Sequence, residues 1–195
     1  MLKTLAVLFP LGLALLPAAG HDASAAEAPR VTTQTFSNWL YRCETAMADG
    51  KPGPTRCDLT QEVTVQQDGK LVPVMTLVFG QGADGKGHVV SLRLPLGVQL
   101  KPGVSVAADD GPAQDFAFYA CGPRGCWVRE APADALLKSF KTGKTGRARV
   151  TFADGRPLAI EFQLAGLADG IAAIDAEAPD AAAAQSAQKP KPKAK

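Results

Sequence analysis

The chain has 195 residues and a formal net charge of +2 at neutral pH. From Glu27 to Asp175 the positive and negative side chains balance at 16 each, so lysines near the C-terminus supply the excess. Nucleic-acid binding depends largely on neutralising phosphates. A neutral body therefore argues against a nucleic-acid partner.

The N-terminus has the pattern of an export signal. Lys3 precedes an apolar run over residues 5–16, and small residues at 23–26 suit a signal peptidase. We place the cleavage after Ala26, so residues 1–26 are the predicted signal peptide. The alternative is an uncleaved anchor, but the run is shorter than the roughly 20 residues that cross a bilayer. We expect a soluble protein of the periplasm, or one secreted or held at the cell surface.

Apolar and polar residues then alternate in a series of short segments. Strands are predicted over residues 36–44, 57–66, 71–79, 88–94, 104–107, 115–121, 126–130, 147–152 and 158–164. Turn-forming sequences separate them, most clearly Asp154-Gly155, which predicts a hairpin. This spacing indicates one mainly β domain over residues 27–175, an antiparallel β-sandwich or partly closed barrel.

One helix is predicted from near Pro132 to Gly143, with Leu136, Leu137 and Phe140 on a single face. A weaker turn or short helix is predicted over residues 168–174. Residues 176–195 lack the large apolar side chains that a core needs, so we expect an extended, disordered tail.

The end of this tail carries alternating lysine and proline. A solubilising terminus is one interpretation. The alternative is a tether that binds anionic envelope polymer or lipid and weakens with salt. The lysines concerned are Lys189, Lys191, Lys193 and Lys195.

Four cysteines lie in the body, and an even count in an exported chain predicts two disulfides. Four cysteines allow three pairings, and chain entropy alone favours a long-range one. Cys43 and Cys57 border adjacent predicted strands, however, and Cys121 and Cys126 flank a four-residue tip. Because a disulfide needs the two Cα atoms roughly 5.5 Å apart, we pair Cys43 with Cys57 and Cys121 with Cys126.

Other chemistry finds little support in the sequence. A four-cysteine metal site is an alternative, but only one of the two short spacings typical of zinc sites is present. His88 is the one histidine beyond the predicted signal, and no serine-hydrolase motif accompanies it. We predict no catalytic residue and no cofactor. A small envelope glycan hydrolase acting through two carboxylates is the enzymatic alternative.

Two tryptophans lie near the cysteines. Trp39 is expected in the core. Trp127 follows the tip that carries Arg124, and we predict that Arg124 and Trp127 contact a partner, because tryptophan and arginine are frequent interface anchors.

Taken together, these segments resemble the invasion-associated locus B family of exported bacterial proteins. The resemblance rests on Trp39 with Cys43, Cys57 with Gln61, residues 94–98 and 102–104, Cys121 with Cys126, Leu136-Leu137 and residues 164–167. It implies an exported β domain named for host-cell invasion, with no assigned enzymatic activity. We therefore expect a non-enzymatic protein that binds an envelope or host protein.

Overall fold

The computed structural model describes residues 27–82 and 85–187 of the chain. The predicted signal peptide lies outside these residues, as do the tail lysines Lys189, Lys191, Lys193 and Lys195, and both expectations stay predictions. Over the described part, the chain forms eleven strands and two helices.

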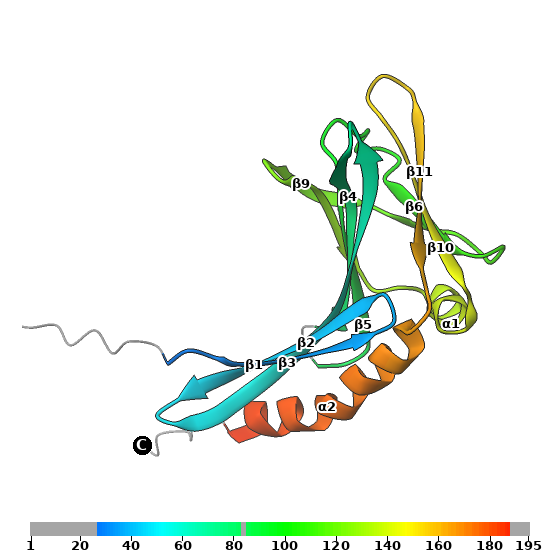
Figure 1. Ribbon diagram of the computed structural model, residues 1–195. Coiled ribbons are helices and arrows are strands. Elements are labelled where there is room, and N and C mark those ends of the chain that lie inside the picture. The colour runs from blue at the N-terminus through cyan, green and yellow to red at the C-terminus, as the bar shows by residue number, and fades with distance from the viewer. Residues whose placement is uncertain (1–26, 83–84, 188–195) are drawn as a thin grey trace, which may run out of the picture.

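The strands form two antiparallel sheets, which Figure 1 shows meeting at an angle. The larger sheet has seven strands in the order β1-β2-β3-β4-β5-β9-β8, and the smaller has four in the order β11-β10-β6-β7. Their bounds are β1 Arg30–Phe36, β2 Trp39–Ala48, β3 Lys51–Gln67, β4 Lys70–Gln81, β5 His88–Leu94, β6 Val104–Ala108, β7 Gln114–Phe116, β8 Phe118–Gly122, β9 Gly125–Glu130, β10 Thr145–Thr151 and β11 Pro157–Gln163. The predicted mainly β antiparallel fold is confirmed, and the sheets do not close into a barrel.

Two predicted strands are wrong because each is interrupted. The segment 36–44 contains a turn at Ser37, whose φ of 52° is left-handed, so β1 ends there and β2 begins at Trp39. The segment 115–121 breaks at Ala117, where the chain passes from the smaller sheet (β7) to the larger one (β8). The Asp154-Gly155 hairpin between β10 and β11 is confirmed.

A row of aromatic rings joins the two sheets through the core. Trp39 packs edge-on against Phe79, Phe79 against Phe140, and Phe140 against Phe162, with centroids 5.7, 5.5 and 6.0 Å apart. Phe140 comes from helix α1 (Asp134–Thr142), which matches the predicted helix. Trp39 is completely buried, as expected of a core residue.

Gln61 on β3 is the one buried polar side chain in the described part of the chain, and it closes the joint between the sheets. Its Oε1 accepts a hydrogen bond from the backbone N–H of Gln163 at 3.0 Å, and its Nε2 donates to the carbonyl of Gln163 at 3.0 Å. The indole N–H of Trp39 donates to the same carbonyl at 3.1 Å. At the end of β11, the side chain of Gln61 thus makes the hydrogen bonds that the backbone of a neighbouring strand would otherwise make.

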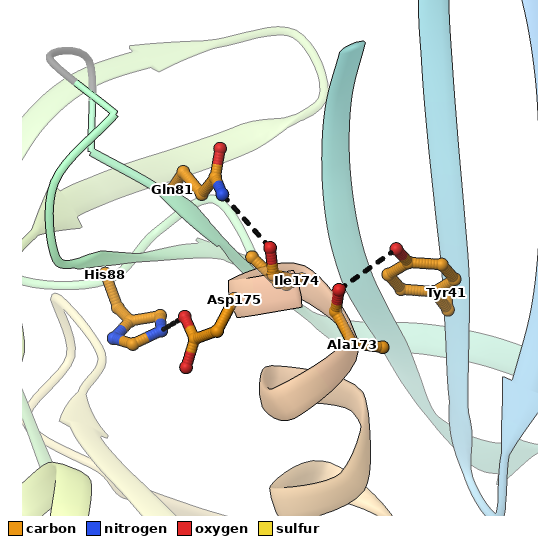
Figure 2. A network of polar contacts seen from close by, with 6 residues as sticks. All are labelled: Tyr41, Gln81, His88, Ala173, Ile174 and Asp175. Carbon is orange, nitrogen blue, oxygen red and sulfur yellow. Dashed lines mark hydrogen bonds and ion pairs between the residues drawn. The ribbon is translucent and has the colours of Figure 1, made fainter. Parts of the chain in front are cut away.

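Helix α2 (Leu167–Ala187) is anchored to the larger sheet by three polar contacts, which Figure 2 shows. Gln81 Nε2 donates to the carbonyl of Ile174 at 3.1 Å, and His88 Nε2 lies 2.8 Å from a carboxylate oxygen of Asp175. Tyr41 donates to the carbonyl of Ala173 at 3.5 Å. Burial first, and the charge of Glu177 second, raise the pKa of Tyr41, so its hydroxyl keeps its proton. Because its ring nitrogen contacts Asp175, His88 has a structural role in holding α2 against the sheet.

The helix extends into the segment that we expected to be an extended tail. A turn or short helix was predicted over 168–174, but α2 continues to Ala187. The physical reason is the run of alanines, because alanine has the highest helix propensity. In the described part, neither helix is long and apolar enough to span a membrane.

Asp109, which directly follows β6, fixes the chain that enters β10. Its carboxylate accepts hydrogen bonds from the backbone N–H groups of Thr145 at 2.9 Å and Lys144 at 3.0 Å. These bonds, Thr145 first, lower the pKa of Asp109 below its ordinary value of 3.8. A lowered carboxyl pKa stabilises the folded state above the unfolded pKa, and this stabilisation is lost as the pH falls through the folded pKa.

We therefore expect Asp109→Asn to lower the melting temperature at neutral pH and to lower it less in acid, below the ordinary pKa. Asparagine tolerates the left-handed backbone at this position, where φ is 44°. Melting curves of both proteins at neutral and acid pH measure the difference. Asp110→Asn is the matched control, and an Asp109→Asn difference that stays constant with pH would contradict the assignment.

Candidate functional site

Both predicted disulfides are present, and each links residues that lie directly opposite in neighbouring strands. Cys43 on β2 pairs with Cys57 on β3, with Cα atoms 4.1 Å apart. Cys121 on β8 pairs with Cys126 on β9, with Cα atoms 4.0 Å apart. All four sulfurs are thus bonded, so none is a thiolate for the four-cysteine metal alternative. No group of three or more potential metal ligands occurs among the described residues.

The surface that carries the predicted contact residues is the side of the larger sheet that faces away from the core, here called the outer face. Strand alternation decides which residues it presents, because their neighbours along each strand are buried. The polar and aromatic members that matter below are Arg42, Glu44, Arg56, Asp58, Glu62, Thr76, Ser91, Arg93, Trp127 and Arg129.

Arg93 on β5 organises one end of this face. Its guanidinium donates to Thr76 Oγ1 at 2.7 Å and to the backbone carbonyl of Arg124 at 3.1 Å, and it lies 3.7 Å from Glu62. The bond to Arg124 ties the turn between β8 and β9 to the body of the sheet. The turn is therefore held by a disulfide on one side and by an arginine on the other.

Trp127 lies beside this anchored turn. It pairs directly with Arg93 across β5 and β9, and it is half-buried. The edge of its ring covers Gly122, where an added Cβ would lie 3.4 Å from the indole. The side chain of Arg124 is exposed at the tip. Of the two predicted contact residues, Trp127 therefore presents part of a fixed ring, and Arg124 presents a charge on a rigid turn.

A groove with a volume of about 200 Å³ continues along the outer face from this end. It crosses β3, β4, β5 and β9, and its lining includes Arg56, Asp58, Ser91 and Arg129. Arg129 is two residues beyond Trp127 on the same strand, so the groove and the ring share one face. The groove thus adds two exposed guanidinium groups to the surface around Trp127.

The carboxylates of this surface differ in their surroundings. Glu44 forms an ion pair with Arg42 at 2.9 Å. Asp58 is half-buried, and desolvation raises its pKa, while a hydrogen bond from Thr60 and the charge of Arg42 oppose the rise. These contacts are those of a charged, hydrogen-bonding surface, and they lend no support to the two-carboxylate hydrolase alternative.

Sequence reasoning proposed Arg124 and Trp127 as contact residues and did not name Arg93, Arg56 and Arg129, which lie on the same face. The available signal was the alternation of buried Val90, Leu92 and Leu94, which places Arg93 on the opposite face. The sequence did not show which strand lies beside β5 in the sheet. The groove depends on the order β3-β4-β5-β9, and the step from β5 to β9 passes over β6, β7 and β8 in the chain.

Comparison with known proteins decides the family, since residues 39–175 match the description "Invasion associated locus B (IalB) protein". The chain belongs to the invasion-associated locus B family. It is 26% identical over 144 residues to "Invasion protein B homolog" from Brucella abortus strain 2308, covering 73% of this chain and 79% of that protein. The homologue from Brucella abortus biovar 1 strain 9-941 matches to the same extent. The crystal structure of invasion associated protein B from Bartonella henselae has a similar fold, with a TM-score of 0.60, 22% identity, and coverage of 74% of this chain and 95% of that one.

The residues that carried the resemblance to the invasion-associated locus B family lie mostly in the scaffold. Trp39 and Gln61 meet at the carbonyl of Gln163, as described above. Gly166 approaches the same region closely, because an added Cβ would lie 2.3 Å from the carbonyl oxygen of Phe36. The family pattern therefore identifies the joint between the sheets, whereas Arg93, Trp127 and Arg129 lie on the outer face.

Proposed function

We propose that this chain is an exported, non-enzymatic envelope protein that binds another macromolecule through the outer face around Trp127. The observation that carries the proposal is the rigid presentation of that residue. Trp127 is packed on Gly122, paired with Arg93 and adjacent to a disulfide-closed turn. Interfaces concentrate their binding energy in tryptophan, tyrosine and arginine that are fixed before binding.

The groove supports a macromolecular partner in two ways. Arg56 and Arg129 give it cationic groups, and its backbone and hydroxyl lining offers further hydrogen-bond donors and acceptors. An extended peptide or an acidic loop is a ligand of suitable shape and charge for such a surface. The names of the Brucella relatives as invasion protein homologues support an accessory role in host-cell invasion or in envelope interaction.

Site-specific photo-cross-linking in intact cells tests this function. A photoreactive amino acid at position 124 is expected to give a discrete cross-linked species, and Trp127→Ala is expected to reduce its yield about tenfold, in the range of a single interface anchor. The same probe at position 71 is the matched control, because Leu71 is 74% exposed on a different part of the larger sheet. Equal cross-linking from both positions, or a yield that Trp127→Ala leaves unchanged, would remove the support for this surface.

A further inference from the structure

The free edge of β1 lies on the opposite side of the larger sheet from β8. β1 pairs with β2 without interruption over all seven of its residues. Apart from that ladder, the described residues make no backbone hydrogen bond with residues 30–36. The outward-facing N–H and C=O groups of β1 are therefore unpaired with protein in the described part of the chain.

β1 lacks the features by which edge strands usually avoid pairing. Residues 31–36 contain no charge, proline or glycine, and three of them are threonines with a valine beside them. β-Branched residues of this kind favour strand pairing. The sequence of β1 thus favours addition of another strand.

The other edges of the two sheets are protected. β8 has a register irregularity and ends in the disulfide-linked turn. β11 begins with Pro157 and carries Glu161, which is paired with Arg147. β7 has three residues. Among the described edge strands, β1 is the long and regular one, and it is uncharged over residues 31–36.

We propose that β1 pairs with β1 of a second copy of this chain, in antiparallel register about Thr33, so that the two larger sheets become continuous. In a continuous sheet, two residues that lie directly opposite each other in neighbouring strands point to the same side of the sheet. The register must therefore place odd-numbered residues of β1 opposite odd-numbered residues of the second copy. The register that does so and pairs every residue puts Thr33 opposite Thr33 of the second copy. Val31 then faces Thr35, and Arg30 faces Phe36.

Charge and exposed apolar surface indicate a second copy as the occupant. Across the two-fold axis no like charges face each other, because Arg30 lies opposite Phe36 and residues 31–36 are uncharged. Val31 and Leu40 are 44% and 46% exposed, and they lie on the same face at this edge because Leu40 pairs with Thr35. In the dimer, Val31 of one copy lies directly opposite Thr35 of the other, and Leu40 lies one strand beyond that Thr35 on the same face. The exposed side chain of Val31 is thereby covered by the pairing.

Thr33→Lys tests the interface, with the whole exported chain measured by sedimentation equilibrium over a range of concentrations. The wild-type chain is expected to be a dimer, and Thr33→Lys is expected to weaken dimerisation at least about tenfold because two lysines face each other at the axis. Val65→Lys is the matched control, since Val65 is 45% exposed and lies on β3 away from this edge. A wild-type chain that stays monomeric, or a dimer that Thr33→Lys does not weaken, overturns the proposal.

A cysteine series tests the register and does not depend on how well the lysine variant folds. All four native cysteines are paired, so a single added thiol reports only on its own position. Thr33→Cys is expected to give a disulfide-linked dimer on mild oxidation. Thr35→Cys is expected to remain uncross-linked, because its partner is Val31. Equal cross-linking of the two variants overturns the register.

Discussion

Replacing Gln61 with leucine is expected to lower the free energy of unfolding by about 1–3 kcal/mol, because it leaves the backbone N–H of Gln163 without its part-buried hydrogen-bond partner. The amide of Gln61 serves both the N–H and the carbonyl of Gln163 at 3.0 Å. Leucine has a similar size but can neither donate nor accept. The indole of Trp39 still satisfies the carbonyl, so the N–H is the group that loses its only described partner.

Urea denaturation measures this loss, and Gln67→Leu is the matched control because Gln67 is exposed on the same strand. Gln61→Glu separates the two halves of the contact. Its carboxylate accepts from the Gln163 N–H but cannot donate to the carbonyl, and it buries a charge, so it is also expected to be destabilising. If Gln61→Leu costs no more than Gln67→Leu, the joint between the sheets does not depend on this side chain.

Removing the Cys43–Cys57 disulfide is the second large effect that we expect. The bond closes a loop with a sequence separation of 14. On the chain-entropy model, its loss in the Cys43→Ala, Cys57→Ala double variant lowers the free energy of unfolding by about 3 kcal/mol. Both cysteines are also buried, at 5% and 6% exposure, so smaller side chains lose packing contacts in addition.

The Cys121–Cys126 pair provides the internal comparison. It closes a separation of five residues, for which the same model gives about 2 kcal/mol. Thermal and urea unfolding of the two double variants under non-reducing conditions measure both costs. A larger loss from the Cys121, Cys126 variant than from the Cys43, Cys57 variant would contradict the chain-entropy argument.

The parts of the fold that were predicted correctly depend on local patterns. β10, β11 and the turn between them follow from strict alternation around Asp154-Gly155. The disulfide pairs followed from strand adjacency, and the register puts each pair directly opposite. Where neighbours in the chain are neighbours in the sheet, sequence spacing was sufficient.

The N-terminal error has a different cause. The apolar residues Trp39, Tyr41 and Cys43 occupy odd-numbered positions, whereas Phe36 occupies an even one. The apolar alternation is therefore interrupted between Phe36 and Trp39, and this interruption marked the turn that the prediction missed. β1 was not predicted because an edge strand exposed along most of its length needs no apolar alternation. The same composition that hid the strand makes its free edge suited to pairing.

Contacts between distant segments account for the rest of the site. Gln61 and Gln163 are 102 residues apart, and Arg93 and Arg124 are 31 apart. Neither pair has a local signature, because both depend on how the sheets are ordered in space. Trp127 and Arg124 could be proposed from residue type alone, but the arginine that holds their turn in place could not.

The last anchor of α2 coincides with the last residue of the family match, since Asp175 both contacts His88 and ends the matched region. The matched region and the printed polar contacts of α2 with the sheet thus both end before the alanine-rich extension that follows. Changes of length or charge in this extension therefore leave the contacts of Tyr41, Gln81 and His88 with α2 in place.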